Sequence, residues 1–252
     1  MTIHLMLHGL GVPPPRVSAG EARYWLSVEK FERILELAKR HSAQISIDDG
    51  NDTDIRIALP ALKRAGLTAF FFVPTDRVGQ PGYLNADDIH ALHDAGMTVG
   101  SHGCAHIEWT KVSDAEIAAD VSKSIDVLSA LLNEPITDVA VPFGDCDLRV
   151  MRVLHKLGMV RVFTSFRGRT SDGAWIIRRT CVTTDTSLAE IEDVLARSYT
   201  AFDDVLAFLR VWKHVGHAAL WRRPNSLQRH DALFSPLSTE HRRPAGESPA
   251  YK

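Results

Sequence analysis

The sequence contains few cysteines and no long hydrophobic segment. Its 252 residues include three cysteines, Cys104, Cys146 and Cys181. An odd number of widely spaced thiols provides no disulfide framework and is typical of a reducing compartment. No apolar run approaches the roughly 20 residues that cross a bilayer, and residues 1–8 lack the basic start of a signal peptide. We therefore expect a cytoplasmic protein without a membrane span.

An excess of charge of either sign is also missing. The chain has 29 Lys and Arg against 31 Asp and Glu, with a pI of about 6.6, so nothing indicates a nucleic-acid-binding surface. The composition, 45% hydrophobic and 24% charged, is typical of a globular protein, and the length suits a single α/β barrel. We expect one domain over residues 1–221. Residues 222–252 are polar and contain prolines, which predicts a poorly packed tail.

Strand-like and helix-like segments alternate along the chain. Short runs rich in β-branched and aromatic residues predict strands at 3–7, 45–47, 69–73, 98–101, 139–141 and 160–164. Apolar residues at a spacing of three to four predict helices at 28–38, 57–65, 86–95, 113–132, 148–157 and 188–196. The alternation predicts a parallel sheet with right-handed crossovers, in which the carboxyl ends of the strands meet at one rim.

Two adjacent carboxylates, Asp48 and Asp49, directly follow the predicted strand at 45–47. An ordinary turn is one interpretation, because Asp and the following Gly50 both favour turns. Unpaired carboxylates at the end of a buried strand are costly, however. The pair therefore indicates a bound cation.

Two histidines, His102 and His106, follow the predicted strand at 98–101. A spacing of four allows two imidazoles to bind one metal ion. His90 and His93 form a similar pair, which we interpret as part of a solvated helix face. For His102 and His106 we favour a metal site, because the strand delivers them to the same rim as the carboxylates. We expect Cys104, between them, to point away as a buried thiol.

A loop, Val-Pro-Phe-Gly, follows the predicted strand at 139–141. The backbone N–H near Phe143 is a candidate for stabilising a developing oxyanion, although a plain loop explains the residues equally well. Trp175 is as consistent with a core residue as with a wall of a substrate site.

These motifs resemble those of the polysaccharide deacetylases with a NodB-homology domain, carbohydrate esterase family 4. Residues 46–50 (Ser-Ile-Asp-Asp-Gly) are similar to the family's T-F-D-D-G, and 102–106 (His-Gly-Cys-Ala-His) to its H-S/T-x-x-H. Residues 140–144 (Ala-Val-Pro-Phe-Gly) are similar to its R-x-P-Y/F stretch. The resemblance extends from about residue 3 to 186.

The resemblance implies a distorted (β/α)7 barrel that hydrolyses an N-acetyl or O-acetyl group on a sugar. By this resemblance Asp48 is the catalytic base, and Asp49, His102 and His106 bind a divalent metal, usually zinc and sometimes cobalt or nickel. The expected partner is an acetylated saccharide. The assignment that the resemblance implies agrees with a metal that activates water beside a second carboxylate that accepts a proton.

The sequence departs from the family pattern at three places. Gly103 replaces the Ser/Thr that follows the first histidine, so the hydroxyl that would steady the loop between the two histidines is missing. Ala140 replaces the arginine that braces the base. No clear counterpart of the late histidine, the general acid, is present; His214 and His217 are candidates. We hypothesise that Arg179 braces Asp48 instead. The alternative for Arg179 is a surface salt bridge of little energetic value. His8, after the first predicted strand, suits either the rim or the core.

The sequence therefore predicts a metal-dependent hydrolase that removes an acetyl group from an acetylated sugar in a polysaccharide, a glycolipid or a sugar precursor. One alternative is an amidohydrolase or deformylase that uses the same site on a substrate other than a sugar. Another is a carbohydrate-binding module whose catalytic site has decayed. Retained metal and a panel of substrates would separate the three.

Overall fold

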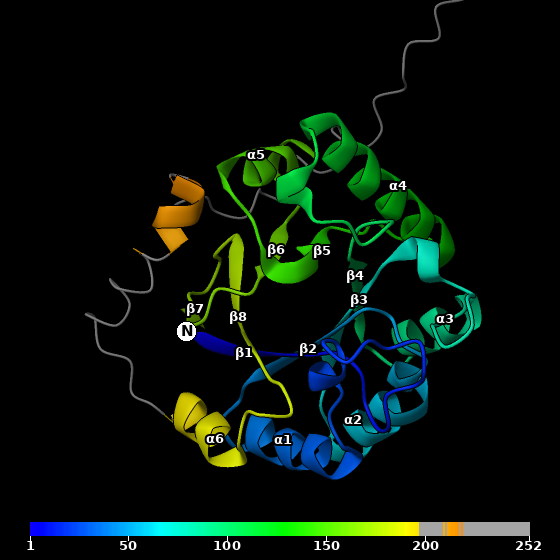
Figure 1. The fold of residues 1–252 in the computed structure, drawn as a ribbon, viewed down its shortest axis with the longest axis vertical. Helices are drawn as coiled ribbons and strands as arrows, with labels where there is room; N and C mark the ends of the chain where they lie inside the picture. Colours follow the sequence, from blue (N-terminus) through cyan, green and yellow to red (C-terminus); the bar gives the residue numbers. More distant parts are fainter. Residues whose placement is uncertain (197–208, 210, 217, 219–252) are drawn as a thin grey trace, which may run out of the picture.

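Seven parallel strands form a closed ring in the computed structural model, which describes residues 1–196, 209, 211–216 and 218. Helices surround this ring, so the fold is the predicted (β/α)7 barrel (Figure 1). The ring runs in the order β1 (Thr2–Leu7), β2 (Gln44–Asp48), β3 (Ala69–Val73), β4 (Thr98–Ser101), β5 (Asp138–Ala140), β6 (Arg161–Thr164) and β8 (Ile176–Cys181). Parallel pairing of β1 with both β8 and β2 closes it.

A two-residue strand, β7 (Arg169–Thr170), pairs antiparallel with the start of β1. The proposed division at residue 221 and the expected tail lie outside the described residues. No helix within the described part of the chain is long and apolar enough to cross a membrane.

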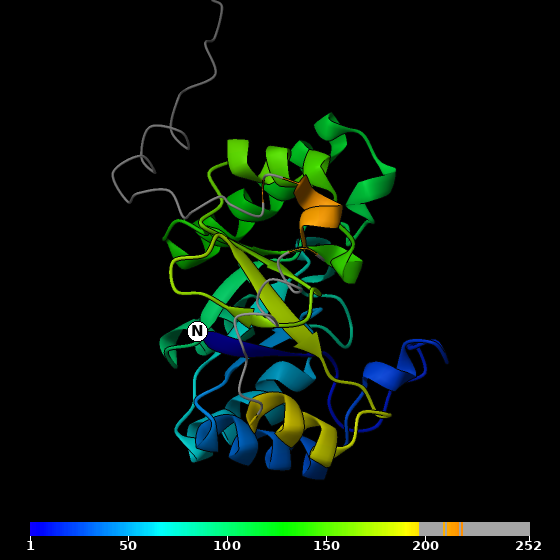
Figure 2. The same ribbon diagram turned by 90° about the vertical axis from the view of Figure 1, so that its left-hand side faces the viewer.

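Among residues 1–196, six helices cover the outer faces of the strands, as Figures 1 and 2 show. They are α1 (Val28–Arg40), α2 (Leu59–Ala65), α3 (Ala86–Asp94), α4 (Asp114–Leu132), α5 (Leu148–Lys156) and α6 (Leu188–Ala196). Their positions confirm the predicted pattern, except that a π-helical turn, Asp54–Ala58, begins the second helix three residues earlier than expected. Short 3-10 turns at Ala22–Tyr24, Thr75–Arg77, Trp109–Lys111 and Pro142–Gly144 lie in the connections.

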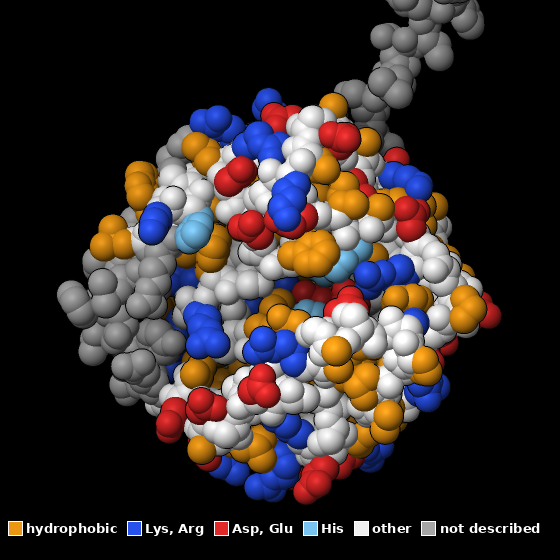
Figure 3. All heavy atoms as spheres, viewed as in Figure 1, with side chains coloured by type: hydrophobic (Ala, Val, Ile, Leu, Met, Phe, Trp, Pro, Cys, Tyr) orange, Lys and Arg blue, Asp and Glu red, His pale blue; other side chains and the backbone are white. Residues whose placement is uncertain are grey.

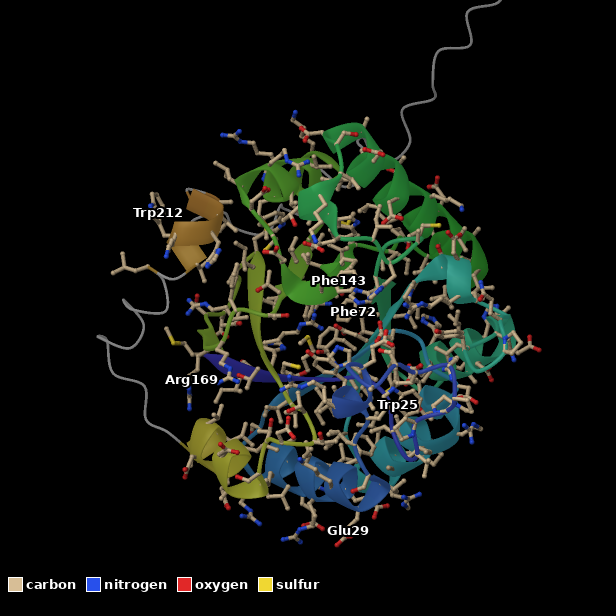
Figure 4. The ribbon with its side chains drawn as sticks, in the orientation of Figure 1. Trp25, Glu29, Phe72, Phe143, Arg169 and Trp212 are labelled. Carbon is tan, nitrogen blue, oxygen red and sulfur yellow. The ribbon has the colours of Figure 1, made fainter. Side chains whose placement is uncertain are left out.

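The apolar residues form two separate clusters because strand side chains alternate between the two faces of the sheet. The larger cluster lies between the strands and the helices. The smaller one fills the barrel interior and consists of Phe70, Phe72, Ala140, Phe163 and Ile177. Figure 4 shows Phe72 near the middle of the ring. The interior is narrow there, because a Cβ at Gly100 would lie 2.6 Å from the Phe72 ring.

The strand β8 was not among the predicted strands. Its sequence, Ile-Ile-Arg-Arg-Thr-Cys, places two arginines where a buried strand normally carries apolar residues. The side chain of Arg179 is nevertheless fully buried. The hydrophobic pattern did not predict this strand because Arg179 occupies an inward position, where it pairs with Asp48 inside the barrel.

Candidate active site

The carboxyl ends of the strands surround a cavity of about 310 Å³. Side chains from β1, β2, β8 and the segments that follow β1, β2, β4, β5 and β6 meet there. The lining consists of Met6, His8, Glu21, Tyr24, Asp48, Asp49, His102, His106, Val141, Phe143, Gly144, Ser165 and Cys181. Figure 3 shows this hollow near the centre of the molecule's face, with acidic and histidine side chains at its floor. Of the predicted site residues, Arg179 is the one that lies behind the cavity wall.

Three of these side chains are placed to share one cation. A ligand atom from each of Asp49, His102 and His106 lies within 4.8 Å of the others. The Nε2 atom of His106 is 3.1 Å from Oδ1 of Asp49, and Nε2 of His102 is 3.9 Å from the same oxygen. Two imidazoles and one carboxylate are a common ligand set of catalytic zinc. The donor set present here therefore fits a divalent metal.

The backbone places two of these ligands in an uncommon conformation. Asp49 has φ +83° and His106 has φ +53°, in the left-handed region that residues other than glycine rarely adopt. Such geometry persists only where the surroundings enforce it, and it is frequent at functional sites. Gly50 follows with φ +62°, where its lack of a side chain lets the chain turn away from β2.

His102 is held in the orientation that a metal ligand needs. Its Nδ1 lies 3.0 Å from the carbonyl oxygen of Ala140, so that Nδ1 donates and Nε2 is left free on the cavity side. Burial lowers the pKa of His102 to about 4. The ring is therefore neutral near pH 7, the form that binds metal.

Asp49 stays ionised in this setting. Burial opposes its ionisation, but the hydrogen bond from His106 favours it, and the pKa of Asp49 lies well below the usual range. Nη1 of Arg77 also lies 3.2 Å from Oδ1 of Asp49. The Asp49 carboxylate is thus ionised, with the guanidinium of Arg77 beside it.

Asp48 forms a buried bidentate ion pair with Arg179. The guanidinium Nη1 donates to Oδ1 at 2.7 Å, and Nη2 donates to Oδ2 at 2.9 Å. Burial alone would raise the pKa of Asp48, but the charge of Arg179 dominates and lowers it. The Oδ2 atom lies 4.0 Å from Nε2 of His102, so the ionised carboxylate stands directly beside the metal ligands.

Phe143 lies at the mouth of the cavity. Its side chain is 64% exposed, and its ring centroid is 4.7 Å from that of His106. It has φ +59° within the turn Pro142–Gly144. Figure 4 shows it close to the ring of strands. The predicted loop therefore reaches the site.

Other candidates from the sequence lie elsewhere. Cys104 donates its thiol hydrogen to Oδ1 of Asp76 at 2.9 Å and is not part of the ligand set. Trp175 is a core residue whose indole N–H donates to the carbonyl of Met159. His214 stacks on Phe166 and does not line the cavity, whereas His217 lies outside the described residues.

Sequence reasoning missed several cavity residues and left one undecided. Glu21, Tyr24 and Ser165 belong to no motif, so no pattern marked them. His8, which suited either the rim or the core, lines the cavity, and its ring lies 4.9 Å from that of Tyr24. Its place directly after a strand was the available signal.

Comparison with known proteins gives consistent results. A family model described as polysaccharide deacetylase matches residues 37–162. Two curated proteins match: YxkH of Bacillus subtilis (strain 168), 21% identical over 127 residues, and chitin deacetylase 1 of Cryptococcus neoformans var. grubii, 24% identical over 175 residues. The matches cover 50% and 69% of this chain but 46% and 35% of those proteins, so the chain spans less than half of their length.

Solved structures show the same fold. The deacetylase PplD of Streptococcus pyogenes, in complex with acetate, superposes with a TM-score of 0.66 at 18% identity, over 77% of this chain and 97% of that one. IcaB from Ammonifex degensii gives 0.66 at 19% identity, over 78% and 98%. With a family model that covers half of the sequence and the barrel that this family has, the chain belongs to the polysaccharide deacetylase family.

Proposed function

We propose that the chain is a metal-dependent hydrolase that removes an acetyl group from an acetylated amino sugar. The observation that carries this proposal is the cluster of Asp49, His102 and His106 at one wall of the cavity, with the ionised Asp48 beside it. A carbohydrate-binding module would have no need of a carboxylate held next to a set of metal ligands. Names of relatives, such as chitin deacetylase, point to the same class of substrate.

In this proposal Asp49, His102 and His106 hold zinc, or alternatively cobalt or nickel. When bound, the metal supplies Lewis-acid activation of the acetyl carbonyl and of the attacking water. The residues contribute a neutral imidazole at His102 and a charged carboxylate at Asp49, both available without a prior change of protonation near pH 7.

Asp48 accepts the proton of the attacking water. Its position beside Nε2 of His102 keeps the carboxylate within reach of a water in the cavity. Arg179 fixes both carboxylate oxygens and prevents rotation of the side chain. The backbone N–H of Phe143 is our candidate for the oxyanion donor, because the turn that holds it lines the cavity.

His8 is our candidate for the group that protonates the departing amine. It lines the same cavity as Asp48 and Asp49, at the end of β1. Its Nδ1 is buried and makes no hydrogen bond within the described residues. Histidine is the side chain that most often serves as a general acid, and an imidazole that lines the cavity is placed to donate a proton there.

The cavity size favours a small acetylated unit. About 310 Å³ is at the lower end of the range for ligand pockets, so we propose that one acetylated sugar enters and that any attached chain extends outside.

The three cysteines are unpaired thiols, which supports a reducing, cytoplasmic location. Proteolytic accessibility of a tagged chain in fractionated cells tests this location.

Metal content and product release test the function. Protein purified without chelator and loaded with zinc should retain about one ion per chain by elemental analysis, and His106→Ala should lose it. The loaded protein should release acetate from chitooligosaccharides, and Asp48→Asn should retain the metal but lose the activity. Formate release from an N-formyl substrate in place of acetate would favour the deformylase. Absence of retained metal in the parent protein would contradict the proposal.

A further inference from the structure

The loop between His102 and His106 is hydrogen-bonded to the carboxylate of Asp120, a residue that belongs to none of the motifs described above. Asp120 lies in α4, 16 residues after Cys104, and only 8% of it is exposed. Its Oδ1 accepts hydrogen bonds from the backbone N–H groups of Cys104 at 3.1 Å and Ala105 at 2.8 Å. Its Oδ2 accepts the indole N–H of Trp109 at 2.9 Å. Three donors thus converge on one buried side chain.

The charge of Asp120 has no cationic partner among the residues that the structure describes. Buried carboxylates without a counter-charge are costly unless hydrogen bonds satisfy them. All three donors come from the segment that includes the turn between His102 and His106. These hydrogen bonds fix the Asp120 carboxylate in place, and the carboxylate in turn fixes the backbone of the turn.

Gly103 is shaped to admit this carboxylate. Its φ is +71°, and a Cβ built on it would lie 2.4 Å from Oδ2 of Asp120. Its N–H donates to Oγ of Ser101, which in turn donates to Oγ of Ser124 in α4. The serine or threonine of the family pattern has no room at this position, so the hydroxyl cannot be the device that steadies the turn in this chain.

The other side of the turn is held by a different element. The N–H groups of Thr75 and Asp76, which follow β3, donate to the carbonyls of Gly103 and Cys104 at 3.2 and 3.0 Å. Asp120 thus takes the N–H groups of the turn while the β3 connection takes its carbonyls. The backbone between the two histidines is therefore held by hydrogen bonds on both sides.

We propose that Asp120 is the positioning residue of the metal site and takes the role for which Gly103 lacks a side chain. The inference rests on the proposed function in that it concerns the same Asp49, His102 and His106 ligands. Asp120 does not touch the metal or the substrate; it holds the N–H groups of Cys104 and Ala105 so that His106 faces Asp49. Partners of this kind commonly contribute 10- to 100-fold to metal affinity.

Zinc affinity of the full chain, measured by competition with a chromophoric chelator, tests this inference. We expect Asp120→Ala to raise the zinc Kd by about 10- to 100-fold. Asp120→Asn keeps one oxygen for the two backbone donors but presents an amide N–H to Trp109 or to the turn, so its Kd should fall between. The control is Asp126→Ala, an exposed aspartate on the same helix, which should leave the Kd within about twofold of the parent value.

Unfolding of the metal-free protein separates positioning from general stability. Each variant is unfolded in urea with chelator present, and its zinc Kd is measured under conditions where it is fully folded. An unchanged Kd in folded Asp120→Ala, with or without a stability loss, would overturn the inference. Should Asp120→Ala not fold, an unchanged Kd in Asp120→Asn would overturn it equally.

A second variant tests the fit at Gly103. Gly103→Ser should raise the zinc Kd on its own, because its side chain displaces Asp120. In combination with Asp120→Ala the two effects should be less than additive, since the serine then enters vacated space. Full additivity would contradict the coupling. Failure of the parent protein to bind zinc would instead reject the proposed function, so the two failures are distinguishable.

Discussion

At the scale of single residues, the barrel interior holds a charge pair that ordinary packing would avoid. Arg179 is fully buried and Asp48 is 2% exposed. Such a pair seldom adds net stability over apolar residues of similar size, but removal of one partner is strongly destabilising. The guanidinium also packs against Phe72 and Phe163, at 5.4 and 5.8 Å from their ring centroids. Function is a better account of this pair than stability.

Arg179→Ala should lower both activity and stability. The uncompensated Asp48 then costs about 3–5 kcal/mol of unfolding free energy, and loss of an oriented, ionised base lowers kcat by roughly 10²-fold or more. Arg179→Lys keeps the charge but not the two-pronged geometry, so it should be intermediate. Acetate release and urea unfolding measure the two effects, with the exposed Arg152→Ala as control. Undiminished kcat in folded Arg179→Ala would reject the bracing role.

A second buried acid gives a pH-dependent prediction. Asp54 is fully buried, and neither carboxyl oxygen has a hydrogen-bond partner within the described residues. Burial, and then the charges of Asp49 and Asp48, raise its pKa well above the ordinary value. The unfolded chain therefore releases this proton above about pH 4, whereas the folded protein retains it. The protein therefore loses stability as the pH rises from about 4 toward the raised pKa of Asp54 in the folded state.

Asp54→Asn should stabilise the protein at neutral pH and have little effect near pH 4. The amide cannot ionise, so the variant avoids the penalty that grows with pH in the parent. Urea unfolding of both proteins in chelator, between pH 4 and pH 8, measures the difference. Asp52→Asn, at a partly exposed residue paired with Arg56, is the control. A difference that shrinks as the pH rises would contradict the raised pKa.

At the scale of the elements, α4 begins with a capping box at Ser113 and contributes Asp120, which binds the turn between His102 and His106. Ser113 accepts the N–H of Glu116 at 3.3 Å, and the Glu116 carboxylate accepts the N–H of Ser113 at 2.8 Å. This is the capping box that the sequence predicts. The same helix supplies Asp120, two turns further on.

Ser113→Ala should separate the stability of α4 from its role at the site. Loss of the cap should reduce the unfolding free energy by about 1 kcal/mol. The zinc Kd of the folded protein should stay within about twofold, because the cap touches none of the groups that Asp120 holds. Calorimetric unfolding and the chelator competition provide the two numbers. A Kd change as large as that of Asp120→Ala would show that any loosening of the helix weakens the metal site.

The sequence predicted the elements that follow a simple period and missed those that do not. Strand β3 is apolar throughout and was recognised, whereas β8 was hidden by Arg178 and Arg179. At the candidate site, Asp49, His102 and His106, which the structure brings together, could be proposed as metal ligands from the sequence because a metal demands particular residue types at short spacing. Asp120 was missed because an aspartate in a charged helix looks like a solvent-exposed residue, and its partners are backbone groups that carry no sequence signal.

At the scale of the whole molecule, the proposed metal ligands come from separate parts of the ring. Asp49 follows β2, and His102 and His106 follow β4, with β3 between them. A ligand that binds the folded state but not the unfolded chain adds stability in proportion to the logarithm of its concentration over Kd. The proposed metal would therefore stabilise the barrel by linking the ends of β2 and β4, in addition to its part in the chemistry.

Metal removal should lower the thermal stability of the entire domain. At a free zinc concentration 100 times Kd the gain is about 2.7 kcal/mol, which corresponds to roughly 5–10 °C in Tm for a domain of this size. Scanning calorimetry with zinc and with chelator measures the difference. Asp49→Asn should unfold at one temperature under both conditions. A zinc-dependent Tm in His106→Ala equal to that of the parent would place the ion elsewhere.

The closure of the ring by β1, β2 and β8 has a consequence for synthesis of the chain. The partners Asp48 and Arg179 are separated by 131 residues, and β1 and β6 each keep an open edge until residues 176–181 are available. A chain emerging from the ribosome thus carries Asp48 long before Arg179, its ion-pair partner, and its unpaired strand edges are exposed meanwhile. In the proposed function the strand that closes the barrel also brings the partner of the base, so a partly made barrel should be inactive.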